Sequence, residues 1–126
     1  MNKDWTFRGY DAVGQKGWVY GDLTHDKKVL KDEPFLDDRV MVGGYEVVPE
    51  SVSMCTGIED KDGTMIYGGD IVRVSYNGKD LFDATIVWIY AGFYMDDEDE
   101  RCYSPIPKNN VKVIGNVYEE RAKDKR

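Results

Sequence analysis

The carboxylates are the side chains of this sequence best suited to chemistry, and two acidic stretches stand out. Asp60-Lys61-Asp62-Gly63 has the look of a calcium loop, but an EF-hand needs Gly at position 6 and Glu at position 12, where this chain has Met65 and Ile71. Residues 96–100 are all acids, with enough charge to attract a divalent cation weakly. We favour a hairpin turn for the first stretch and a solvated, self-repelling loop for the second.

Histidine, cysteine and serine offer little for metal or nucleophilic chemistry. His25 is the single histidine, so a three-histidine zinc site is impossible within one chain, and we expect it on the surface. Cys55 and Cys102 form no CxxC motif and are interpreted as buried or unreactive thiols. The chain has no Gly-x-Ser-x-Gly elbow and no phosphate-binding glycine loop. We therefore predict no catalytic residue, no metal, no cofactor and no enzyme activity.

Aromatic side chains, 13% of the chain, are the remaining class with a binding use. Six of them would suffice for a platform on which a sugar or a nucleic-acid base stacks: Trp5, Trp18, Tyr20, Trp88, Tyr90 and Tyr94. The formal net charge of −7 opposes a phosphate backbone over most of the surface. We favour places in the core and on sheet faces for these rings.

The elements that position these residues are predicted to be β-strands. Fourteen Val and seven Ile stand against only four Leu and four Ala, and branched side chains fit strands better than helices. The chain of 126 residues offers no amphipathic helix long enough to connect parallel strands. We therefore predict a mainly β fold of short antiparallel strands.

Turn residues divide the chain into hairpins. We predict an N-terminal hairpin from residues 5–10 and 17–23, a polar surface excursion over residues 24–39 with at most a short strand at 28–30, and a hairpin centred on Gly43-Gly44. One helical turn is expected near Pro49.

The second half contains two further hairpin centres, Asp62-Gly63 and Asn77-Gly78. Residues 84–90 are apolar on both faces, which predicts a central strand covered on each side. A last strand is predicted over residues 111–118.

We expect residues 1–58 to form a β-hairpin region and residues 59–120 a small β-barrel that shares buried surface with it. Residues 108–126 contain six basic and three acidic residues, and the last part of this segment, residues 121–126, is expected to be a flexible basic tail. The start of the sequence has no apolar leader, the chain has two cysteines, and no apolar run is long enough for a bilayer. These features favour the cytoplasm and no membrane association.

Four segments, in order and spacing, resemble the YopX family of bacteriophage and prophage proteins: Phe7-Arg8-Gly9-Tyr10-Asp11, Trp18-Val19-Tyr20-Gly21-Asp22-Leu23, the long segment at residues 56–72, and Val113-Ile114-Gly115-Asn116-Val117-Tyr118-Glu119. The third is the most specific. Gly68 stands where the family usually has Glu, and residues 51–55 also depart from its pattern.

The resemblance implies a β-rich fold, with an SH3-like small barrel in the second half, and no reaction. Its motif residues are expected to be structural: Phe7, Arg8, Asp11, Trp18, Tyr20, Gly21, Gly57, Asp60, Gly63, Ile66, Tyr67, Gly69, Asp70, Ile114, Gly115, Asn116 and Tyr118. The glycines suit turns, Asp60 and Asp70 suit acceptance of backbone N–H bonds, and Ile66, Ile71 and Ile114 suit the core.

We interpret the chain as a phage or prophage accessory protein that binds an unknown protein partner through sheet edges or an aromatic face. Association of two or more copies of the chain is a possible addition to this hypothesis. The alternative is a nucleic-acid-associated module that uses the small barrel and the basic tail. It predicts binding that weakens as salt rises.

Overall fold

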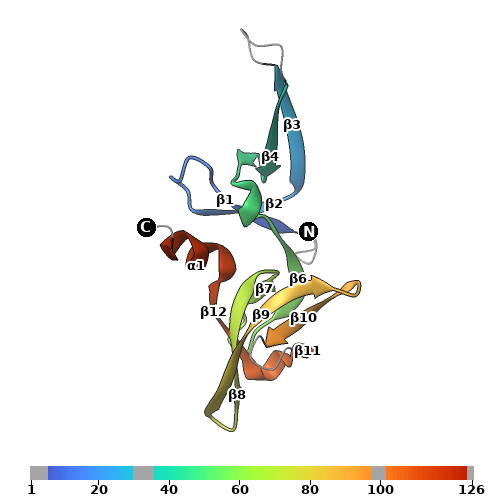
Figure 1. Ribbon diagram of the computed structural model, residues 1–126, viewed down its shortest axis with the longest axis vertical. Helices are drawn as coiled ribbons and strands as arrows, with labels where there is room; N and C mark the ends of the chain where they lie inside the picture. Colours follow the sequence, from blue (N-terminus) through green and yellow to red (C-terminus); the bar gives the residue numbers. More distant parts are fainter. Residues whose placement is uncertain (1–5, 30–35, 98–101, 125–126) are drawn as a thin grey trace. The chain divides into compact units, whose positions relative to one another are not determined.

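The computed structural model describes residues 6–29, 36–97 and 102–124, and the chain forms two compact units, residues 1–54 and 55–126. Antiparallel strands dominate both units (Figure 1), which confirms a mainly β protein. The expected division into a hairpin region over residues 1–58 and a second region over residues 59–120 that share buried surface stays a prediction.

The elements of unit 1 are β1 (Phe7–Tyr10), β2 (Trp18–Gly21), β3 (Leu23–Val29), β4 (Leu36–Val42), β5 (Tyr45–Glu46) and the 3-10 turn η2 (Pro49–Ser51). Unit 1 contains the β1–β2 hairpin and a three-stranded sheet of order β3-β4-β5. β1 pairs with β2, and β4 pairs with both β3 and β5. The predicted Gly43-Gly44 turn is confirmed, with φ of 60° and 86°. Val19, Val42 and Val47 form the buried core.

Residues 24–39 contain more strand than the short segment expected at 28–30. Strands β3 and β4 pair through this region in seven successive positions, from Leu23 opposite Val42 to Val29 opposite Leu36. Backbone hydrogen bonds of a hairpin form whatever the side chains are, so strands rich in charged residues carry no hydrophobic pattern that would reveal them.

Unit 2 contains one larger sheet. Its elements are β6 (Ser53–Glu59), whose first two residues belong to unit 1, β7 (Met65–Tyr67), β8 (Asp70–Tyr76), β9 (Lys79–Ile89), β10 (Gly92–Asp97), β11 (Cys102–Ser104), the 3-10 turn η3 (Lys108–Asn110), β12 (Val111–Asn116) and helix α1 (Val117–Asp124). The five-stranded order is β11-β10-β9-β8-β12. This open order leaves an SH3-like barrel as a prediction.

The core of unit 2 lies on one face of this sheet. Its buried side chains come from β7, β8, β9, β10 and β12: Ile66, Val72, Val74, Ala84, Ile86, Met95 and Val111. The predicted central strand is confirmed, since β9 pairs with β8 and β10. It is not covered along its whole length, because Trp88 is 58% exposed.

The end of the chain differs from the expectation. Strand β12 stops at Asn116 instead of reaching Tyr118, and α1 follows at once. Residues 121–124 of the expected flexible tail are therefore helical, while residues 125–126 lie outside the described part. Asn116 caps this helix, since its side-chain oxygen accepts the Glu119 N–H at 2.8 Å.

Candidate functional site

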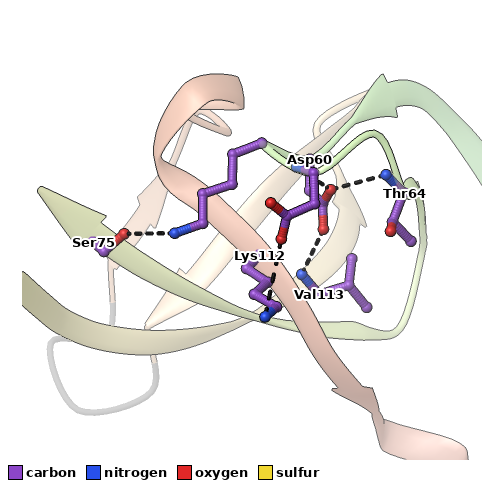
Figure 2. Close-up of polar contacts among 7 residues, drawn as sticks. Asp60, Thr64, Ser75, Lys112 and Val113 are labelled. Carbon is purple, nitrogen blue, oxygen red and sulfur yellow. Dashed lines mark hydrogen bonds and ion pairs between the residues drawn. The ribbon is translucent and has the colours of Figure 1, made fainter. Parts of the chain in front are cut away.

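Asp60 lies between β6 and β7, and its buried carboxylate accepts three backbone N–H groups (Figure 2). Oδ1 accepts from Asp62 and Thr64, each at 2.9 Å. Oδ2 accepts from Val113 of β12, also at 2.9 Å. The first two bonds brace the hairpin turn, and the third ties that turn to a strand 53 positions later in the chain.

The bonds to Asp60 also set its ionisation. Burial, the largest single effect, raises the pKa of this carboxyl. The backbone N–H groups of Val113, Thr64 and Asp62, together with the Lys112 ammonium, lower it by more. The net pKa is therefore below the ordinary value of 3.8. The group is an anion at neutral pH with three of its acceptor sites used by the backbone. Such a carboxylate is a poor proton acceptor and fits a structural brace.

Two lysines lie around this brace without contacting its oxygens closely. Lys112 Nζ is 4.0 Å from Asp62 Oδ2, and Lys61 Nζ is 3.5 Å from Ser75 Oγ (Figure 2). Both lysines are exposed. Their positive charges offset part of the negative charge of the turn.

A second brace surrounds the turn between β7 and β8. The buried Asp70 carboxylate accepts the Tyr67 N–H at 2.8 Å, and Gly69 takes a φ of 85°. The Gly69 carbonyl accepts the Val117 N–H at 2.8 Å, which holds the start of α1. Asn116, the cap of that helix, is the cross-strand partner of Asp70. Motif residues from both ends of unit 2 thus meet here.

The N-terminal motif residues form a third group in unit 1. Arg8, 8% exposed, places its guanidinium carbon 4.6 Å from the centre of the Trp18 ring and donates from Nε to Ser53 Oγ at 2.9 Å. Asp11 accepts the N–H groups of Val13 and Lys16 and so braces the turn between β1 and β2. These contacts hold the hairpin together.

Exposed rings gather at the end of the β9–β10 hairpin. Tyr90 is 79% exposed and its ring meets that of Tyr103 edge to face, with centroids 6.3 Å apart. Trp88 and Phe93 form another edge-to-face pair at 4.9 Å. Tyr90 and Ala91 both have positive φ, 52° and 59°. Tyr90, Tyr103 and Trp88 are exposed, unlike the buried carboxylates, whereas Phe93 is half-buried and packs against the core of unit 2.

A family model described as YopX protein matches residues 6–122 of the chain. The chain belongs to the YopX family. The structure is also similar to the crystal structure of protein EF1440 from Enterococcus faecalis, with a TM-score of 0.52, 20% sequence identity, and coverage of 92% of this chain and 94% of that chain. That likeness supports the fold alone. Comparison with curated proteins gives no match.

The glycines of the YopX motif occupy positions that restrict the backbone. Gly57, Gly63 and Gly69 have φ of 78°, 85° and 85°, where a Cβ is disfavoured. Gly115 adjoins an irregularity in the β12–β8 register, and Gly21 approaches Gly43 so closely that a Cβ would lie 2.8 Å from its Cα.

The apolar YopX motif residues divide between buried and exposed positions. Ile66 is fully buried and Tyr67 nearly so. The expectation that Ile114 fills the core is wrong, since it is 42% exposed. Val111 and Val113 pack into the core of unit 2, so alternation along β12 places Ile114 on the opposite face with the exposed Lys112. Ile71, Phe7, Trp18 and Tyr118 are half-buried, and Tyr20 is exposed.

The His25 and Cys55 side chains of this YopX protein do not belong to the groups described above. His25 is exposed and Cys55 is a buried free thiol, as predicted. Within the described residues, no three His, Cys, Asp or Glu side chains gather as a metal site. Trp5, residues 98–100 and the Cys102 side chain lie outside what is described.

In the described ranges of the chain, no helix combines the length and the apolar character needed to cross a bilayer.

The sequence reasoning did not single out the Tyr90-Ala91 turn, because neither residue is a usual turn former at positive φ.

Proposed function

We propose that this YopX protein is a phage or prophage accessory protein that acts in the bacterial cytoplasm by binding another protein, and not by catalysis. The observation that carries the proposal is the set of exposed rings at the β9–β10 hairpin, above all Trp88 and Tyr90, 58% and 79% exposed. Tyrosine and tryptophan are enriched in protein interfaces, where a large rigid ring buries much area at little entropic cost.

The braced carboxylates support the same proposal from the opposite direction. Asp60 and Asp70 are buried and bonded to the backbone, so the acids of the YopX motif stabilise turns. A motif devoted to the framework leaves recognition to the exposed residues. We also propose that the five strands of unit 2 curve into an SH3-like barrel. The register shifts in the β8–β9 and β12–β8 pairings support this, because such irregularities bend strands.

The proposal is tested by cross-linking pull-downs from bacteria that carry prophages. The full chain is compared with Tyr90→Asn, which removes the ring and suits a positive φ, and with Tyr76→Ser, which removes a 62% exposed ring from the β8–β9 hairpin. We expect a specific protein to be retained by the full chain and by Tyr76→Ser and to be lost with Tyr90→Asn. Equal retention by all three chains would contradict the proposal.

The same exposed rings would also allow two copies to associate. Light scattering over a range of concentrations measures this, and a mass that stays at the monomer value removes self-association from the proposal. Binding of DNA or RNA that falls as salt rises, and falls further on deleting residues 121–126, would favour the nucleic-acid alternative instead.

A further inference from the structure

Three tyrosines and one acid lie at the outer side of the sheet of unit 2, opposite the core. Met95 and Ile86 are paired and buried, so Tyr94 and Asp96, which alternate with Met95 along β10, point to the other face. Tyr103 is the cross-strand partner of Asp96, so it lies on that same face. The Tyr90 ring contacts Tyr103. We name Tyr90, Tyr94, Tyr103 and Asp96 the tyrosine face.

Two backbone features keep these rings accessible. A Cβ on Gly92 would lie 3.3 Å from Tyr94 Cε2, so the missing side chain leaves room for the Tyr94 ring beside the strand. The β9–β10 turn holds Tyr90 at a φ of 52° and Ala91 at 59°, although Asn-Gly would fit such a turn without strain. The strained turn holds Tyr90, the most exposed ring of the described residues, toward solvent. This observation is separate from the contacts among the rings.

Strands β10 and β11, which carry Tyr94, Asp96 and Tyr103, contain acids and no base, and Arg73 of β8, on the same face of the sheet, is paired with Asp83 at 2.9 Å. Residues 84–97 and 102–104 contain Asp96 and Asp97 and neither lysine nor arginine, within a chain of net charge −7. Among the described residues, no hydrogen bond or ion pair engages the half-buried Asp96 carboxylate. Aromatic faces attract cations through their quadrupole, and a neighbouring carboxylate adds an ion pair.

We propose that the tyrosine face binds an arginine-bearing segment of a protein partner. The guanidinium is planar, so it stacks on a tyrosine ring while its N–H groups reach a carboxylate, which a lysine ammonium does less well. The negative charge that attracts such a segment repels phosphate, so a basic peptide fits this surface better than a nucleic acid. This inference rests on the proposed function and names the chemistry of the partner.

The test is calorimetric titration of the full chain with octa-arginine and with octa-lysine. We expect tighter binding of octa-arginine, and a loss of about fivefold in affinity for Tyr103→Leu, which removes one ring and keeps an apolar side chain. Asp96→Asn is expected to weaken binding by a similar factor. Tyr90→Asn supplies a second ring deletion that fits its turn if Tyr103→Leu does not fold.

Matched controls separate this site from general attraction to an acidic chain. Tyr76→Ser and Asp80→Asn remove an exposed ring and an exposed acid from the β8–β9 hairpin and are expected to change the affinity by less than about twofold. The inference is overturned if Asp80→Asn weakens binding as much as Asp96→Asn, or if neither ring deletion weakens it.

The outcomes also distinguish the two proposals. A captured partner that depends on Tyr90 yet still binds Asp96→Asn with full affinity would leave the proposed function standing and remove the arginine specificity. Peptide binding at the tyrosine face without any protein captured from cells would support the surface and remove the proposed function.

Discussion

At the scale of single residues, Asp60 is the clearest case of an acid used for architecture. Three backbone N–H groups share its buried carboxylate, so removing it takes the acceptor from all three partly buried donors. We predict that Asp60→Ala lowers the free energy of unfolding by about 2–4 kcal/mol, measured by urea denaturation. Asp62→Ala, which removes an exposed group in a 4.0 Å ion pair, should cost less than about 1 kcal/mol. Similar losses for both variants would argue against the brace.

The lowered pKa of Asp60 makes the same contribution depend on pH. Since the folded-state pKa lies below the unfolded value near 3.8, the ionised carboxylate stabilises the fold above that value. This stability is lost as the pH falls through the folded-state pKa. We therefore expect unfolding free energies measured from about pH 6 to about pH 3 to fall less steeply in Asp60→Asn than in the parent chain. Parallel curves would show that other groups carry the acid sensitivity.

Two isoleucines of the YopX motif are predicted to behave differently. Ile66 is fully buried in the core of unit 2, whereas Ile114 is 42% exposed beside a register shift. We expect Ile66→Ala to cost about 2–5 kcal/mol and Ile114→Ala less than about 1 kcal/mol in thermal or urea unfolding. A large loss for Ile114→Ala would mean that this side chain is covered in solution.

At the scale of elements, the β9–β10 turn stores strain that a substitution can release. Tyr90 and Ala91 both occupy the left-handed region, at about 1 kcal/mol or more each relative to favoured turn residues. We predict that Ala91→Gly raises the unfolding free energy by about 1 kcal/mol. Arginine-peptide affinity should stay unchanged, because Tyr90 is retained. The same substitution at Ala84, which is buried in β9, is the control and should destabilise.

The turns were the elements best predicted from sequence. Gly43-Gly44 and Asn77-Gly78 carry their own backbone signal, since each supplies residues that tolerate positive φ, and both hairpins are present. Strand β3 carries no such signal, because polar residues follow one another through it. Helix α1 was missed because its cap, Asn116, is itself the last residue of strand β12. Residue types therefore predict the positions of turns better than the extent of the strands and helix between them.

At the scale of the whole molecule, the two units differ in the core that the described residues supply. Seven buried side chains cluster in unit 2 and three in unit 1. We therefore predict slower amide hydrogen exchange at Val72 and Ile86 than at Val42. Faster exchange in unit 2 would indicate that the core of unit 1 is the stronger. Exchange measured at low denaturant concentration would show whether the units open separately.

The groupings that matter most were beyond sequence reasoning. The family resemblance identified Asp60 and Asn116 as motif residues, and turn chemistry predicted that Asp60 accepts backbone N–H bonds near it. That Asp60 reaches Val113, or that Asn116 lies opposite Asp70, depends on the register between distant strands. The tyrosine face was equally hidden, because sheet pairing brings Tyr103 beside residues of another strand.

The bond between Asp60 and Val113 has a consequence for how the protein is made. Strand β12 follows every other strand of its sheet in the chain and supplies both Val113 and the core residue Val111. While a ribosome is still adding these residues, the free edge of β8 and the carboxylate of Asp60 have no long-range partner. Completion of unit 2 therefore waits for the late emergence of β12, and until then the unpaired edge of β8 is open to pairing with other chains.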